Sequence, residues 1–155
     1  MLGDEGQGWA VAMDLLPYER STALWVRVAF LQRRLDELVA MVEPGGVSDE
    51  VVGEVHQQLV TLRARSRATQ YRMASGDKLG PETSVDKILL ATTEQAIFDL
   101  ARDGLDAAIV VGDEPGEARW RAEYLYSRAA SIYGGSSEIQ RNIVARRLLD
   151  LGSDR

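Results

Sequence analysis

The chain has 155 residues, of which 45% are hydrophobic and 27% are charged, and its formal net charge is −6 at pH 7. This composition is typical of one soluble globular domain, and the negative charge argues against nucleic acid as a partner. The chain has no cysteine, which excludes disulfides and thiolate sites and is compatible with the reducing cytoplasm, where we expect the protein. We expect no secretory signal in MLGDEGQGW and no membrane span, because no apolar run approaches about 20 residues.

Hydrophobic residues recur about every 3.6 positions along the chain, which predicts helices, and no long segment alternates with the two-residue period of a strand. We expect a first helix from Trp9, interrupted or kinked at Pro17. Between Leu24 and Val42 the apolar residues are spaced alternately by four and three, as in a long packed helix. EPGGVSD then ends this helix, and Ser48 is a good N-cap for the next.

Three further helices follow the second, which has its apolar stripe from Val52 to Met73 and ends near SGDKLGP. The third begins at about Glu82, and its expected stripe is Val85, Ile88, Leu89, Thr92, Ala96 and Leu100. VVGDEPG is a predicted loop, a fourth helix covers about 117–131, and a fifth follows YGGSS. The sequence therefore predicts an all-α, antiparallel bundle of four to five helices, with residues 1–155 forming one domain.

The stretch YGGSS runs directly into the fifth predicted helix and allows two interpretations. A helix N-terminus offers unpaired N–H groups and the positive end of the helix dipole, which suit an anion or the polar edge of a cofactor. The other interpretation is that Ser136 or Ser137 simply caps the helix and Glu138 simply favours its first turn. The residues alone favour simple capping.

A second candidate is Glu19 in LLPYERS, which stands close behind Pro17 in an apolar neighbourhood. A carboxylate in such surroundings has a raised pKa and can act as a general base. The simpler interpretation is a solvated glutamate in the turn after a kink, and the residues alone favour it.

Arginines, the single histidine and the tryptophans carry weaker signals. Four arginines on the second predicted helix could meet phosphates: Arg63, Arg65, Arg67 and Arg72. They do not share one helix face, which favours a solvated or salt-bridged surface. His56 is the only histidine, and a single histidine on a helix gives no metal site. We expect the three tryptophans in the core or an interface: Trp9, Trp25 and Trp120.

Three segments together resemble one known family. IYGGSSEIQRNIVAR resembles the C-terminal signature of the acyl-CoA dehydrogenases, the flavin enzymes that desaturate acyl-CoA thioesters. LGDEGQGWAVAMDLLPYERS resembles the start of the C-terminal helical domain of these enzymes, and SVDKILLATTEQAIFDLA resembles the third long helix of that domain. The three segments lie in the right order over nearly the whole chain, which makes the resemblance specific.

The resemblance implies an activity, a cofactor and partners. In the family, an N-terminal helical domain and a middle β-domain precede the bundle, and neither is present in residues 1–155. We therefore expect the last domain alone, as a piece of a longer protein or as a subunit. FAD lies between the β-domain and the bundle, partly across a subunit interface. A carboxylate removes the α-proton of the acyl-CoA substrate while a hydride passes to the flavin. Homo- or hetero-oligomers and an electron-transfer flavoprotein or similar acceptor are also implied.

The resemblance also implies roles for individual residues. Many members read Y-E-G-T where this chain has YGGS, and the glutamate of that motif, their catalytic base, is replaced by Gly134. A minority branch places the base on the earlier helix, immediately before an arginine, which corresponds to Glu19 and Arg20. The implied catalytic residue is thus Glu19. The implied substrate-binding residues are Arg20 and Gly135, the implied FAD-binding residues are Ser136, Ser137 and Glu138, and no metal is implied.

Two segments depart from the family pattern. Members carry R-x-x-F-G between the first two long helices, where this chain has VEPGGVSDE. They carry Q-x-x-G-G-x-G after the third, where this chain has LDAAIVVGDEPG. Both family segments reach the far end of FAD across the dimer. Their loss indicates a divergent branch, such as a hetero-oligomer with asymmetric FAD sites, or, as an alternative, a non-catalytic subunit that keeps the bundle for oligomerisation and assembly.

Overall fold

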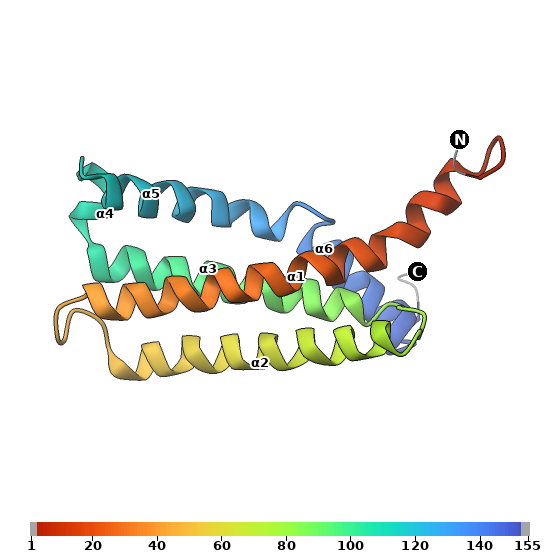
Figure 1. The fold of residues 1–155 in the computed structure, drawn as a ribbon, viewed down its shortest axis with the longest axis horizontal. Coiled ribbons are helices and arrows are strands. Elements are labelled where there is room, and N and C mark those ends of the chain that lie inside the picture. The colour runs from red at the N-terminus through yellow and green to blue at the C-terminus, as the bar shows by residue number, and fades with distance from the viewer. Residues whose placement is uncertain (1–2, 153–155) are drawn as a thin grey trace.

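Helices make up all the regular structure that the computed structural model describes. It covers residues 3–152, with the backbone alone over residues 20–23. The elements are α1 (Gly8–Met41), α2 (Asp49–Ala74), α3 (Thr83–Leu105), α4 (Ala107–Val111), α5 (Pro115–Ser127), the short helix η1 (Arg128–Ser131), α6 (Ser137–Ile143) and the π-helical turn η2 (Val144–Leu148) (Figure 1). No strand occurs in the described range, and the predicted all-α bundle is confirmed.

The first two helices form an antiparallel pair, as the apolar spacing predicts. The buried side of α1 is the predicted stripe of Leu24, Val28, Leu31, Leu35 and Leu38. It packs into one core with buried residues of α2, namely Val55, Leu59 and Leu62. Ser48 is the N-cap residue of α2, as expected, although its side chain makes no capping hydrogen bond. Pro17 does not end α1, which runs through it, and the N-terminal part of α1 bends away and projects beyond the bundle (Figure 1).

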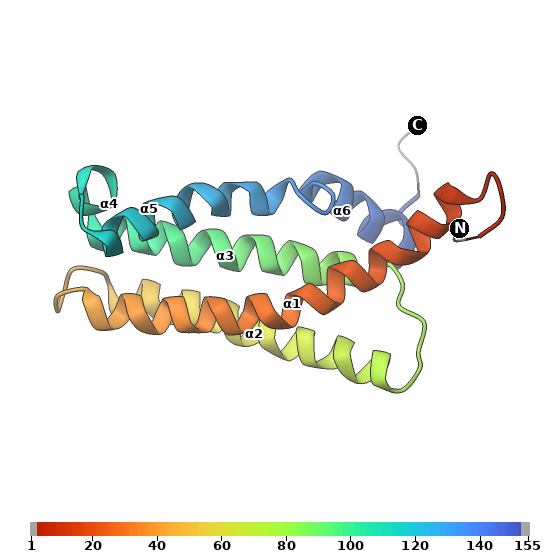
Figure 2. The same cartoon turned by 45° about the horizontal axis from the view of Figure 1, so that its top comes forward.

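Helix α3 is the central element, because it packs against α1, α2, α5 and α6 (Figure 2). The stripe predicted for this helix is correct in part: Leu100 is buried, Leu89 and Ala96 are half-buried against the core, and Thr92 is exposed. The most deeply buried apolar side chains are instead Ile97, Phe98 and Ala101. A helix enclosed by neighbours buries several faces, polar positions included, so one apolar stripe does not describe it.

The C-terminal part folds back along α3. Asp106, with a φ of 44°, separates α3 from α4, so part of the predicted VVGDEPG loop is helical. Helix α5 begins at Pro115 behind a capping box between Glu114 and Glu117, and the predicted fourth helix corresponds to α5 followed by η1. The predicted fifth helix corresponds to α6 and η2. Helix α6 thus lies near the N-terminal half of α1 (Figure 2).

The three tryptophans have different environments. Trp120 of α5 is 2% exposed and belongs to the core, where its ring meets that of Phe98 edge-on, with centroids 6.0 Å apart. Trp9 and Trp25 of α1 are 77% and 46% exposed. The expectation of a core or interface position is confirmed for Trp120, which lies in the core, and for Trp9 and Trp25 the interface position stays a prediction.

Replacing Phe98 by alanine should lower the free energy of unfolding by about 3–5 kcal/mol, because it leaves a cavity where α3 meets α1 and α5. Urea denaturation followed by circular dichroism measures this loss. The control is Val26→Ala on the same bundle, at a side chain that is 71% exposed, which should change stability by less than about 0.5 kcal/mol. Equal effects of the two changes would contradict the assignment of Phe98 to the core.

Candidate functional site

The Gly-Gly turn before α6 lies against the N-terminal half of α1. Gly134 and Gly135 have φ angles of 64° and 95°, the left-handed region that favours glycine. A Cβ atom built on Gly134 would lie 4.0 Å from Oε1 of Glu19 and 3.3 Å from Cε of Lys87. The fold thus brings the carboxylate of Glu19 beside the position where most of the resembled family carries its catalytic glutamate.

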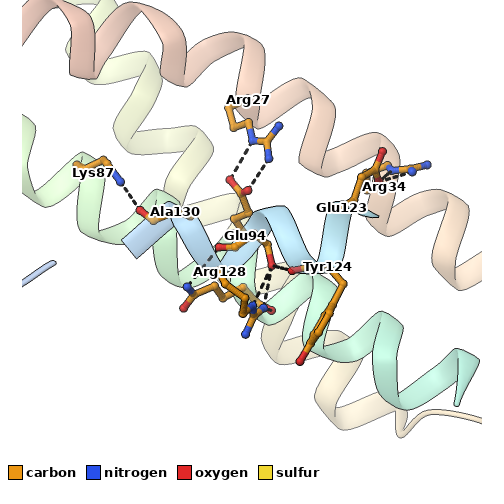
Figure 3. Close-up of polar contacts among 10 residues, drawn as sticks. Arg27, Arg34, Lys87, Glu94, Glu123, Tyr124, Arg128 and Ala130 are labelled. Carbon is orange, nitrogen blue, oxygen red and sulfur yellow. Dashed lines mark hydrogen bonds and ion pairs between the residues drawn. The ribbon is translucent and has the colours of Figure 1, made fainter. Parts of the chain in front are cut away.

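Two side chains hold the turn in place. Gln140 of α6 is fully buried, and its amide nitrogen donates to the carbonyl oxygens of Gly134 and Gly135 at 3.2 and 3.3 Å. Lys87 of α3 donates to the carbonyl oxygen of Ala130, at the other end of the turn (Figure 3). A turn with two flexible glycines is therefore fixed by hydrogen bonds to its carbonyl groups.

The start of α6 carries the predicted cofactor-binding residues. Ser136 is the N-cap of α6, and its hydroxyl oxygen accepts a hydrogen bond from the Ile139 amide at 3.4 Å. The contact of Ser136 with FAD stays a prediction. Ser137 is half-buried and Glu138 is exposed. Hydrogen bonds from its own backbone amide and from the Ser136 hydroxyl lower the pKa of the Glu138 carboxyl. Glu138 is therefore a weaker base than an ordinary glutamate.

The other predicted residues are placed as follows. Glu19 is an exposed residue of α1. Gly135 is half-buried in the turn. Arg20 follows Glu19 in α1, and its side chain lies outside the described residues. The structure thus brings Glu19, Gly135 and the start of α6 to one end of the bundle.

A buried ion pair lies deeper in the bundle, close to Tyr133. Nε of Arg27 donates to Oε2 of the fully buried Glu94 at 2.9 Å, and a second hydrogen bond joins the same side chains (Figure 3). Burial alone would lower the pKa of Arg27, but the hydrogen bond and charge of Glu94 outweigh it and raise that pKa. Burial, followed by the charge of Glu94, raises the pKa of Tyr133 to about 12.

The sequence interpretation missed Lys87 and Glu94, although one signal was available. The two charged residues lie seven positions apart on α3, so they share one face of a helix that is otherwise largely apolar. Gln140 and Arg27 gave no such signal, because a polar residue on an amphipathic helix is ordinarily solvated.

The arginines of α2 divide into two pairs. Arg65 bonds to the buried Asp86 of α3, with 2.9 Å between Nε and Oδ1, and Arg72 pairs with Glu82. The salt-bridged interpretation is therefore correct for these two. Arg63 and Arg67 instead line an open hollow of about 640 Å³ together with Trp25. This hollow lies between α1 and α2, and none of the predicted site residues lines it.

The end of the bundle remote from α6 carries the two segments that depart from the family pattern. The α1–α2 loop and the α4–α5 connection lie together there (Figure 1). Arg121 is used internally, because it donates to the carbonyl oxygens of Val110 and Gly112 at 3.1 and 3.0 Å. Glu43 of the α1–α2 loop and Asp113 of the α4–α5 connection are exposed carboxylates at this end. Such a surface repels phosphate groups.

The described residues show neither a cluster of candidate metal ligands nor a membrane-spanning helix. Between residues 3 and 152 no three side chains among histidine, aspartate and glutamate are grouped so that they could hold a metal ion. Within the same range, no helix combines the length and apolar character needed to cross a lipid bilayer.

Comparison with known proteins identifies the family. Residues 6–149 match the model of the acyl-CoA dehydrogenase C-terminal domain. The chain belongs to the acyl-CoA dehydrogenase family. It is 33% identical over 153 residues to acyl-CoA dehydrogenase IpdE1 of Mycolicibacterium smegmatis, a match that covers 97% of this chain and 38% of the relative. It is 31% identical over 158 residues to IpdE1 of Mycobacterium tuberculosis, covering 97% of this chain and 40% of the relative.

Solved structures show the same fold. The Tcur3481-Tcur3483 steroid ACAD G363A variant superimposes with a TM-score of 0.80 and 20% identity, over 99% of this chain and 42% of that chain. The apo form of PigA gives a TM-score of 0.77 and 18% identity, over 94% of this chain and 40% of that chain. This acyl-CoA dehydrogenase domain thus spans about 40% of the length of its curated relatives.

Tyr133 should give this domain a specific alkaline instability. Its pKa is about 12 in the fold, against an ordinary value of 10.0. A raised pKa means that neutral Tyr133 stabilises the fold fully below about pH 10, and that this contribution is lost as the pH rises towards 12. The stability advantage of the wild type over Tyr133→Phe should therefore shrink between pH 9 and 11.5, as measured by urea denaturation.

The matched control is Tyr71→Phe, which removes the hydroxyl of a tyrosine that is 65% exposed. A constant stability difference between wild type and Tyr133→Phe over this pH range would contradict the assignment.

Proposed function

We propose that this chain is the catalytic C-terminal domain of an FAD-dependent acyl-CoA dehydrogenase, with Glu19 as the base that removes the α-proton of the thioester. The observation that carries the proposal is the approach of Glu19 Oε1 to within 4.0 Å of the Cβ position of residue 134. Gly134 has no carboxylate, and Glu19 of α1 offers one close to that position of the turn. The matching family model and the IpdE1 relatives support the reaction class.

The rival carboxylate is less suitable. Both Glu19 and Glu138 are exposed in this chain. Hydrogen bonds hold the pKa of Glu138 below the ordinary value, so it is a poor acceptor for the proton of a weak carbon acid. Glu19 lies beside a turn whose backbone is fixed by Gln140. A fixed neighbour keeps the distance between base and substrate constant, and such positioning is a large part of the rate.

The residues at this end fit one edge of FAD. Ser136 and Ser137 offer hydroxyl groups at the start of α6, next to a glycine turn without side chains. When bound, FAD supplies the two-electron oxidation that no protein side chain can perform. Ser136, Ser137 and Glu138 would hold its edge, and Arg20 and Gly135 would lie against the substrate. The opposite end, with Arg121 engaged and carboxylates exposed, does not fit a pyrophosphate.

The substrate and partners follow from this proposal. The substrate is an acyl-CoA thioester, and the electrons pass on to an electron-transfer flavoprotein or a similar acceptor. The missing part of the cofactor site would come from other domains or from a second subunit, in a homo- or hetero-oligomer. The exposed apolar side chains of Trp9 and Leu15 on the projecting part of α1 support such contacts.

The alternative is a non-catalytic subunit that uses the bundle for oligomerisation and assembly. The acidic end that carries Glu43 and Asp113 favours it, because the family segments that reach FAD there are replaced. The two functions differ in one respect that can be measured, namely whether removing the basicity of Glu19 slows the oxidation of acyl-CoA.

Replacing Glu19 by glutamine in the assembled flavoenzyme should slow flavin reduction by acyl-CoA at least about 10²-fold, the lower end for general base catalysis. Glutamine keeps the shape of the side chain and loses the basicity, so acyl-CoA should still bind. Rapid mixing with observation of flavin bleaching measures the rate. An unchanged rate would contradict the assignment and favour the assembly subunit.

The matched control is Glu138→Gln, which should weaken FAD retention more than it slows flavin reduction. A Glu19→Gln, Gly134→Glu double variant tests whether the carboxylate can be moved. It should recover part of the activity only, because position 134 has a φ of 64° and Lys87 lies 3.3 Å from the new Cβ atom.

The 155-residue chain alone should not hold FAD tightly, since its described residues fit one edge of the cofactor and repel phosphate at the other end. Dialysis of the chain with FAD, followed by the absorbance spectrum and by titration calorimetry, measures retention. A yellow preparation with one flavin per chain would show this expectation to be wrong.

A further inference from the structure

Lys87 is a buried cation, and an uncharged side chain of similar volume would pack equally well at this position. It is 5% exposed and lies near the start of α3. Burial of an ammonium group costs free energy unless hydrogen bonds and favourable charges compensate for it. A methionine would occupy a similar volume without this cost. The charge at this position therefore calls for an explanation that packing does not give.

Lys87 contacts the turn that precedes α6. Its Nζ donates a hydrogen bond to the carbonyl oxygen of Ala130 (Figure 3). The same Nζ lies 4.5 Å from the centroid of the Tyr133 ring, a cation–π distance. Its Cε lies 3.3 Å from the Cβ position of Gly134. One side chain of α3 thus contacts the turn at Ala130 and at Tyr133 and lies close to Gly134.

The turn needs such support, because its own backbone is permissive. Gly134 and Gly135 both adopt left-handed angles, and glycine moves between backbone conformations more easily than any other residue. Gln140 holds the carbonyl groups of the two glycines from the side of α6. Lys87 holds the opposite end of the turn from the side of α3.

We propose that Lys87 is a positioning residue, whose ammonium group fixes the turn from Ala130 to Gly134 so that the turn faces the carboxylate of Glu19 at a constant distance. The Cε of Lys87 and the Oε1 of Glu19 approach the same point at position 134, at 3.3 and 4.0 Å. The inference rests on the proposed function in assigning the proton transfer to Glu19. Lys87 itself contributes no proton to the reaction and acts through the turn.

Three variants separate charge from volume. Lys87→Met keeps the length of the side chain and removes the donor, so the carbonyl oxygen of Ala130 loses this hydrogen bond. Lys87→Arg keeps a cationic donor. Lys78→Met is the matched control, since Lys78 is the only other lysine in the sequence and is exposed between α2 and α3.

The first measurement uses the chain by itself and needs no cofactor. In Lys87→Met, the backbone amides of residues 132–136 should exchange with deuterium at least about 10-fold faster, while the amides of α2 keep their protection. Lys87→Arg and Lys78→Met should leave the turn close to wild type. An unchanged exchange rate in the turn would overturn the proposal, and so would an equal loss of protection throughout the bundle.

A measurement on the wild type guards against a variant that fails to fold. The ammonium protons of Lys87 should exchange with water at least about 10-fold more slowly than those of Lys78 in ¹⁵N-detected spectra, because they are buried and hydrogen-bonded. Equal exchange rates for the two lysines would overturn the proposal whatever the variants do.

The third measurement uses the assembled flavoenzyme. Lys87→Met should slow flavin reduction by about 10- to 100-fold, since displacement of a reacting group by about 1 Å costs this much. Acyl-CoA affinity should stay within about threefold, and Lys87→Arg should restore most of the rate. If Glu19→Gln slows flavin reduction and Lys87→Met does not, the positioning role of Lys87 is contradicted while the proposed function of Glu19 stands. If Glu19→Gln keeps its rate, the proposed function fails, and the exchange of the turn still decides whether Lys87 holds it.

Discussion

The fold depends on the need to compensate three charged side chains inside α3. Asp86 and Glu94 have no exposed surface, and Lys87 has very little. Each is met from a different direction: Arg65 of α2 bonds to Asp86, Arg27 of α1 bonds to Glu94, and the backbone at the end of η1 accepts from Lys87. Leaving one such charge without its partner costs about 3–5 kcal/mol. Apolar packing brings the helices together, and these contacts define how each one lies along α3.

The same contacts explain why the candidate site forms where it does. The ion pair of Arg27 and Glu94 prevents α1 from sliding along α3. It therefore also fixes the position of Glu19 along the axis of the bundle. The hydrogen bond of Lys87 fixes the turn that contains Gly134 relative to the same helix. Two segments far apart in the sequence therefore share one reference helix. A shift of α1 or of the turn relative to α3 would therefore change the distance between the Glu19 carboxylate and the turn.

Sequence reasoning predicted the parts that rest on apolar spacing and missed those that rest on buried polar groups. The stripe of α1 from Leu24 to Leu38 is buried as predicted, because one face of that helix meets the core. The stripe predicted for α3 is correct only in part, since the enclosed helix also buries Glu94 and exposes Thr92. Glu19 came from the family resemblance and not from its apolar neighbourhood. The role of Lys87 has no sequence signature, because it contacts a backbone oxygen that any residue would offer.

The short separation between Glu19 and position 134 limits how the site can change. A chain with glutamates at both positions would hold two carboxylates within contact of each other, and Oε1 of Glu19 is already 4.0 Å from the Cβ position at Gly134. A carboxylate carried on that Cβ atom would lie near the one of Glu19, and neighbouring carboxylates disfavour each other's ionisation, so the pair would share a proton. A shared proton removes the basicity that proton abstraction requires. A carboxylate on α1 therefore disfavours a second carboxylate at position 134 of the turn, so the two arrangements are alternatives.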